Sequence, residues 1–128
     1  MYGIDKELEA NMEVIIRDTQ DPAVELVAQL MAKAIRLKPK YAEAYLDRAL
    51  AYGDLGQNER AIQDFSTAIS LSPDNGEAYL FRGMSYLEQK KYFWGYRDAK
   101  KASELGEDKL LEWVKNYKIK PVIQNTKY

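Results

Sequence analysis

The stretch that decides the fold lies at 42–75 and reads AEAYLDRALAYGDLGQNERAIQDFSTAISLSPDN. When the chain is shifted by 34 residues, 76–109 repeats its pattern of apolar and polar positions. Ten aligned positions are identical, namely Glu43/Glu77, Ala44/Ala78, Tyr45/Tyr79, Leu46/Leu80, Arg48/Arg82, Tyr52/Tyr86, Asp64/Asp98, Ala68/Ala102, Leu71/Leu105 and Asp74/Asp108. Because similarity at one fixed period is typical of repeat architectures, we expect a stack of short structural units.

The preceding stretch, 8–41, aligns with 42–75 at the same period. Eight aligned positions are identical, namely Glu9/Glu43, Ala10/Ala44, Glu25/Glu59, Gln29/Gln63, Ala34/Ala68, Ile35/Ile69, Leu37/Leu71 and Pro39/Pro73. Three units therefore run through the chain, at about 8–41, 42–75 and 76–109. The length of 128 residues fits one domain, so we expect a single domain over 1–128.

Each unit is expected to fold as two helices, because large apolar residues recur at helical spacing in two runs. Gly56 allows the turn between the runs of the middle unit, and Pro73 ends the second run because proline lacks an amide hydrogen. Gly106 is the expected cap at the end of the third unit. The expected helices of the middle and third units lie at 42–55, 59–71, 77–89 and 92–105.

A closing helix is expected after the third unit, over 108–117. Leu110, Trp113 and Val114 lie on one stripe of it, with charged residues opposite. Such a helix would cover the apolar face that the third unit leaves open. The tail over 118–128 has no helical period, so it is expected to be extended or disordered.

Small and aromatic residues take characteristic places in the middle unit. They are Tyr45, Ala49, Tyr52, Ala61, Phe65, Ala68 and Pro73. With the 34-residue period of paired helices, this pattern resembles the tetratricopeptide repeat. The resemblance implies an all-α superhelix of about three helix-turn-helix repeats with a C-terminal capping helix. The third unit departs from the pattern with Ala99 at the aromatic position.

Two glycines of the third unit lie inside expected helices, at Gly83 and Gly95. A glycine in a helix interior costs about 1 kcal/mol relative to alanine. Paired helices can cross closely only where a side chain is small. We therefore expect both glycines at close contacts between helices.

Composition excludes several classes of function. The chain has no Cys and no His, which removes the thiolate metal site, the commonest general base and the commonest metal ligand. No catalytic spacing or phosphate loop occurs, so we expect no enzyme and no cofactor. A net charge of −1 does not give the surplus of Lys and Arg that binding to nucleic acid or anionic lipid requires. No apolar run reaches the ~18 residues that a membrane span needs, and the expected location is cytoplasmic.

The tetratricopeptide resemblance implies that the first helix of each unit lines a concave groove that binds partner peptides. The expected groove residues are Glu43, Leu46, Asp47, Leu50, Asp54, Glu77, Leu80, Phe81, Met84 and Glu88. The first unit would add Met12 and Ile16. This apolar surface with acidic edges predicts a protein scaffold whose partner segment is apolar and basic. The leucines and Met84 have an alternative place in the core.

One tetratricopeptide subgroup binds the C-terminal carboxylate of cytosolic chaperones through Lys, Asn and Arg. The corresponding positions here carry Met12, Ile16, Asp47, Glu77 and Phe81. The required cations are absent and two acids are present. Carboxylate capture of that kind is therefore not expected, because like charges repel.

Phe93 and Trp94 form a possible second contact patch. They fall where the middle unit has Glu59 and Arg60, which are expected to face water. Three alternatives remain open for the two rings: cover by the closing helix or tail, a homodimer interface, or a partner site. The alternative function to a partner-binding scaffold is a self-associating structural module, or a subunit or fragment of a larger assembly.

Overall fold

The computed structural model describes residues 22–116, and within them the chain is all-α. The helices are α2 (Pro22–Leu37), α3 (Ala42–Asp54), α4 (Asn58–Leu71), α5 (Gly76–Glu88), α6 (Tyr92–Glu104) and α7 (Lys109–Asn116). Four of them, α3 to α6, begin and end within one residue of the bounds predicted from the sequence.

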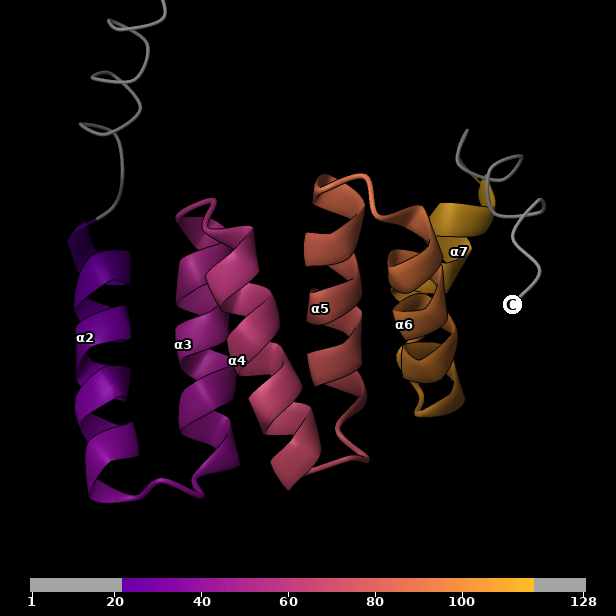
Figure 1. Ribbon diagram of the computed structural model, residues 1–128. Helices are drawn as coiled ribbons and strands as arrows, with labels where there is room; N and C mark the ends of the chain where they lie inside the picture. Colours follow the sequence, from indigo (N-terminus) through magenta and orange to yellow (C-terminus); the bar gives the residue numbers. More distant parts are fainter. Residues whose placement is uncertain (1–21, 117–128) are drawn as a thin grey trace, which may run out of the picture.

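The helices stand side by side in chain order, with α2 at one end of the row and α7 at the other (Figure 1). Each helix packs against the next, and α5 also contacts both α3 and α7. This arrangement confirms the helical-repeat fold. The predicted first helix of the first unit, with Met12 and Ile16, lies outside the described residues, as does the tail over 118–128.

Three helix ends share one backbone device. The second residue after the end of α3, α5 and α6 has a left-handed backbone: Gly56 with φ 75°, Lys90 with φ 60° and Gly106 with φ 97°. After α6, the amide of Glu107 donates to the carbonyl of Ala102 at 2.8 Å, which closes the helix end. The predicted cap at Gly106 is confirmed, while α5 uses a lysine where the other two helices use glycine.

The core of the middle unit is built on one aromatic ring among small residues. Phe65 is 1% exposed and packs with Leu46 and with alanines of α3, α4 and α5. Its ring stacks against Phe81 of α5, with 6.3 Å between the ring centroids and 15° between the planes. The aromatic position of one unit therefore joins that unit to the next.

The core of the third unit is built differently. Ala99 stands at the position equivalent to Phe65 and is fully buried, together with Leu110 and Val114 of α7. The side chains of the closing helix thus occupy the space that an aromatic ring fills in the middle unit. This packing accounts for the departure from the repeat pattern at Ala99.

Gly83 and Gly95 lie at the closest approach of α5 and α6. A Cβ atom on Gly83 would lie 2.8 Å from Leu110 Cδ2, and one on Gly95 would lie 2.5 Å from Leu87 Cδ2. Each would also lie 3.2 Å from the carbonyl oxygen of the other glycine. The prediction that these glycines permit close helix contact is confirmed.

Candidate functional site

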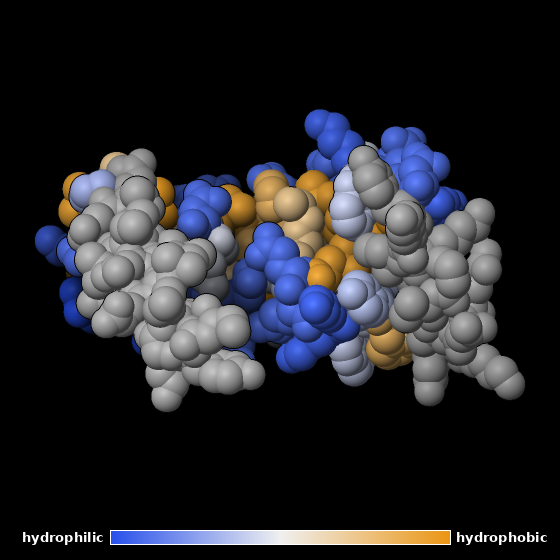
Figure 2. All heavy atoms as spheres, turned by 90° about the horizontal axis from the view of Figure 1, so that it is seen from above, coloured by the Kyte–Doolittle hydropathy of each residue, from blue (hydrophilic) through white to orange (hydrophobic). Residues whose placement is uncertain are grey.

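An apolar groove runs along the third unit, between α5 and α7. One face of α5 supplies residues at helical spacing, and α7 and the start of α6 complete the walls. The groove has a volume of about 800 Å³ and is lined by Leu80, Phe81, Met84, Leu87, Glu88, Lys90, Tyr92, Lys109, Leu110 and Trp113. Seen from above, hydrophobic side chains gather in the middle of the molecule, between hydrophilic ones (Figure 2).

The floor and the rim of this groove differ in burial. Phe81 is held by its stack on Phe65, and Leu80 packs against the cluster of Ala99, Leu110 and Val114. In contrast, Met84 is 42% exposed and Trp113 is 43% exposed. The floor is therefore fixed by the core, and the rim presents large apolar side chains to solvent.

A few polar groups line the groove, near the turn between α5 and α6 and at the start of α7. The Glu88 carboxylate accepts a hydrogen bond from Asn58 Nδ2 at 3.0 Å, which ties α5 to the start of α4. Lys90 and Lys109 also line the groove. The groove thus combines a long apolar surface with a few charged side chains, as binding sites for protein segments usually do.

Four of the ten predicted groove residues line this groove: Leu80, Phe81, Met84 and Glu88. Leu46 is only 8% exposed and lies in the core, which was the alternative place for it. Leu50 packs against the same core cluster. The acids are exposed and line other surfaces: Glu43, Asp47, Asp54 and Glu77.

Sequence reasoning missed several groove residues. Leu87 follows Leu80 and Met84 at helical spacing, so the period of α5 carried a usable signal for it. Trp113 was expected on the covering face of the closing helix, and nothing in the sequence placed it at a rim. Lys90 and Tyr92 flank the turn between α5 and α6, where no helical period applies.

Acidic side chains concentrate on the first half of α3. Burial, and next the neighbouring Glu43 carboxylate, raise the pKa of Asp47 above its ordinary value. Glu43 also raises the pKa of Tyr41, whose hydroxyl donates a hydrogen bond to it at 3.3 Å. The carboxylates of Glu43 and Asp47 therefore repel each other on the first half of α3.

A second hollow lies between α5 and α6 and includes one of the two predicted patch residues. It has a volume of about 600 Å³ and is lined by Tyr79, Arg82, Tyr86, Trp94, Arg97, Asp98, Lys100, Lys101 and Glu104. We call it the α5–α6 recess. Trp94 is 47% exposed, whereas Phe93 is only partly exposed.

The rings of the predicted patch contact each other and a cation. Phe93 and Trp94 meet edge to face, with 4.9 Å between the ring centroids. The guanidinium of Arg97 lies over both rings, 5.6 Å from the Trp94 centroid and 5.9 Å from that of Phe93. On the other side, Trp94 approaches Tyr86 at 6.3 Å.

Each of the middle and third units contains one Arg–Asp pair between its two helices. Arg48 Nε donates to Asp64 at 2.7 Å, and Arg82 Nε donates to Asp98 at 2.8 Å, in both cases with a second parallel bond. The hydrogen bond to Asp64 raises the pKa of Arg48. At Arg82, burial is the largest influence and lowers the pKa, but the hydrogen bond to Asp98, the charge of Asp98 and the neighbouring Tyr86 and Tyr79 together raise the pKa above its ordinary value.

Comparison with known protein families identifies one of the repeats. The family model described as tetratricopeptide repeat matches residues 42–75. Residues 42–75 therefore form a tetratricopeptide repeat. No curated protein sequence gives a significant match.

Solved structures of MamA resemble this chain over more than one repeat. One MamA crystal structure aligns with a TM-score of 0.60 and 30% identity, covering 64% of this chain and 48% of that one. A second, MamA MSR-1 C2, aligns with a TM-score of 0.63 and 25% identity, covering 68% and 50%. The chain thus spans about half the length of these two structures. A MamA mutant at 21% identity, with a TM-score of 0.54 over 83% of this chain and 90% of its own, shares the fold.

These likenesses indicate a module for protein–protein interaction or assembly. Among residues 22–116, no helix is long and apolar enough to cross a membrane. The same residues hold no group of three or more acidic, His or Cys side chains placed to bind a metal ion.

Proposed function

We propose that this protein is a non-catalytic scaffold whose α5–α7 groove binds a short apolar segment of a partner protein. The observation that carries the proposal is the exposed apolar rim over a floor fixed by the core. Met84 and Trp113 each keep more than two fifths of their surface in solvent. Exposed apolar surface of this extent, inside a groove, favours an interaction site.

The shape and composition of the groove favour a side-chain-rich segment such as an amphipathic helix. Its volume of about 800 Å³ is in the range of sites that accept several side chains. Met84 is flexible and can adapt to different apolar partners. Trp113, on the facing helix, offers a large flat surface of the kind that is enriched at interface hot spots.

We propose further that the partner segment carries Lys or Arg beside its apolar anchors. Glu88 lines the groove together with Lys90 and Lys109, while Glu43 and Asp47 lie outside the groove lining, on α3, where they repel each other. A basic residue of the segment that extends beyond the groove to α3 would relieve that repulsion, and an acidic one would increase it. The same charges oppose the capture of a chaperone C-terminal carboxylate.

The proposal is tested with a synthetic amphipathic peptide that has Leu on one face and Lys on the other. Met84→Glu should weaken its binding about tenfold or more, because a charge would enter the apolar rim. The matched control is Leu37→Glu, the same kind of change at a position that is 78% exposed on α2. Calorimetric titration of the wild type and both variants measures the effect.

Equal weakening by Met84→Glu and Leu37→Glu would overturn the groove assignment. Circular dichroism of each variant separates loss of binding from loss of fold. Sedimentation across a concentration range tests the alternative, a self-associating module. A chain that associates with itself, and loses that association with Met84→Glu, would make the groove a subunit interface.

A further inference from the structure

The α5–α6 recess contains an arrangement that occurs in both the middle and the third unit. It consists of an arginine that lies over two tyrosine rings and pairs with an aspartate, and we call it the frame. In the third unit, Arg82 lies over the rings of Tyr79 and Tyr86, at 5.6 Å and 5.8 Å from their centroids, and pairs with Asp98. In the middle unit, Arg48 lies over Tyr45 and Tyr52 at 5.9 Å and 5.7 Å and pairs with Asp64. A frame repeated at the same positions is explained by the packing of each helix pair.

The rim around this frame is not repeated. At successive rim positions the middle unit has Arg60, Gln63, Ser66, Thr67 and Ser70. The third unit has Trp94, Arg97, Lys100, Lys101 and Glu104 at the same positions. One rim is therefore mostly small and neutral, while the other is aromatic and cationic. Packing of the frame cannot require the third-unit rim, since the middle unit folds without it.

The cations of the recess are not all neutralised by the protein. The lining contains four cationic and two acidic side chains, a local surplus of two positive charges in a chain of net charge −1. Asp98 is engaged by Arg82 in two hydrogen bonds. Glu104 lies 3.6 Å from Lys101, where both side chains are about half exposed and the pair is weak.

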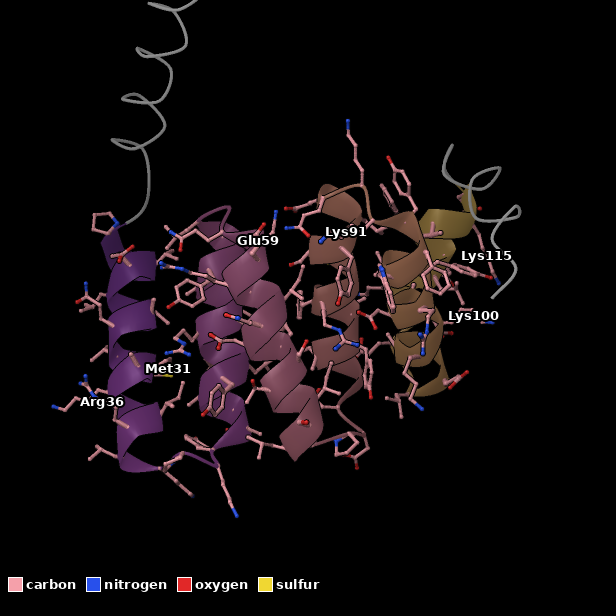
Figure 3. The ribbon with its side chains drawn as sticks, in the orientation of Figure 1. Met31, Arg36, Glu59, Lys91, Lys100 and Lys115 are labelled. Atoms are coloured by element: carbon pink, nitrogen blue, oxygen red, sulfur yellow. The ribbon has the colours of Figure 1, made fainter. Side chains whose placement is uncertain are left out.

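Arg97 and Lys100 carry the surplus charge. Within residues 22–116, neither forms a salt bridge with a carboxylate. Arg97 lies over Trp94, and the Lys100 ammonium lies 5.7 Å from the Tyr96 centroid. Lys100 lies on α6, far along the helix row from Arg36 on α2 (Figure 3). Stacking on rings orients these cations but leaves them without an anionic partner.

We propose that the α5–α6 recess is a second binding site, which takes an acidic peptide segment of a partner protein. Carboxylates of the segment would pair with Arg97 and Lys100, and a flat apolar side chain would lie on the exposed ring of Trp94. A peptide fits better than a nucleic acid strand, because the lining has a surplus of only two positive charges. Affinity for a nucleic acid backbone depends on the neutralisation of many phosphates by Lys and Arg.

The second site complements the groove. The groove is proposed to take an apolar and basic segment, and the recess an acidic one. The two surfaces lie on different sides of α5, since no residue lines both. One short repeat stack could thus hold two segments of opposite charge at the same time.

The chain offers a separate fluorescent reporter for each site. It contains two tryptophans, of which Trp94 lines the recess and Trp113 lines the groove. In a Trp113→Phe protein, the emission of Trp94 reports the recess alone. The probe is a short Glu-rich peptide with a single Phe. We expect it to shift Trp94 emission with saturation, and to bind more weakly as salt is added.

Removal of the two unpaired cations is the decisive change. Arg97→Ala with Lys100→Ala should weaken the acidic peptide about tenfold, because each rim cation contributes to attraction across an interface. The matched control is Lys33→Ala with Arg36→Ala, the same loss of charge on exposed positions of α2. The control pair should change the affinity less than twofold. A peptide of the same charge that carries phosphoserine and binds more tightly would support the site and identify phosphate as its preferred anion.

Three results would overturn this proposal. The acidic peptide fails to shift Trp94 emission, or the two charge-removal pairs weaken binding equally, or oligouridylate binds as tightly as the peptide. None of these results would test the groove proposal, because Met84 and Trp113 do not line the recess. Failure of the groove proposal would likewise not contradict the recess proposal.

Discussion

The middle and third units share a frame and differ in what surrounds it. Both have an Arg–Asp pair between two tyrosines, and both end their first helix with a left-handed residue. The middle unit fills its core with Phe65, while the third unit has Ala99 and receives side chains from α7. The shared positions hold the helices together, and the differing positions shape the groove and the recess.

The largest expected effect concerns the aromatic position. Phe65→Ala should lower the free energy of unfolding by about 3–5 kcal/mol, because it empties a fully buried site and removes the stack on Phe81. The reciprocal change, Ala99→Phe, should also destabilise, by about 1–3 kcal/mol, since Leu110 and Val114 occupy that space. Urea unfolding measures both. A stabilising Ala99→Phe would contradict the described packing of α7.

Substitution by alanine should change the free energy of unfolding in opposite directions at two glycines. Gly83→Ala should destabilise by about 1–3 kcal/mol, because its Cβ would meet Leu110 at 2.8 Å and Asp98 Cβ at 3.1 Å. Gly53→Ala, in α3 of the middle unit, should stabilise by about 0.5–1 kcal/mol, because nothing lies within 4 Å and alanine favours the helix. Thermal and urea unfolding of the pair check the prediction, and the same sign for both would refute it.

The left-handed positions after α3 and α5 carry different residues, Gly56 and Lys90, and each residue can be placed at the other position. Lys90→Gly should stabilise the protein by about 0.5–1 kcal/mol, because glycine adopts a φ of 60° without strain. Gly56→Lys, at the equivalent place in the middle unit, should destabilise by a similar amount. Unfolding curves for both variants test the exchange. If Lys90→Gly lowers stability, then Lys90 makes a contact in the groove that outweighs its backbone cost.

The smallest expected effect is electrostatic. The pKa of Asp47 is raised in the folded state, so its ionised form destabilises the fold at neutral pH, and this cost disappears as the pH falls through that pKa. Asp47→Asn should therefore stabilise by about 0.2–0.5 kcal/mol at neutral pH, as removal of a like-charge pair one helical turn apart does. The gain should vanish in acid. In a Glu43→Gln background it should shrink, which a double-mutant cycle measures.

Much of the fold was predictable, because the repeat encodes it locally. Helix periods, Pro73 and the glycine turns fixed the helix bounds, and internal glycines marked the close contacts. The groove was only partly predictable. Leu46 and Leu80 are identical aligned residues, yet Leu46 is buried among full-length helices while Leu80 faces the eight-residue α7. Position in the stack, and not the residue type, decides their exposure.

The recess was harder to predict than the groove. Arg82 and Asp98 are 16 residues apart, and no helical period links that separation. The identical residues at these aligned positions indicated that both units need an Arg and an Asp there. They did not indicate that the two side chains contact each other. Phe93 and Trp94 were predicted as a possible contact patch from their positions in the repeat, with cover by the chain itself as one alternative. Arg97 and Lys100 look like ordinary surface charges until the fold places them beside the rings.

The central claim is that the α5–α7 groove is the site for the apolar and basic segment, and one measurement tests it most directly. The Leu/Lys amphipathic peptide is titrated into two single-tryptophan proteins, Trp94→Phe and Trp113→Phe. We expect a saturable shift in the emission of Trp113 in the first protein and no shift of Trp94 in the second. A shift of Trp94 alone, or of neither tryptophan at any peptide concentration, would contradict the account.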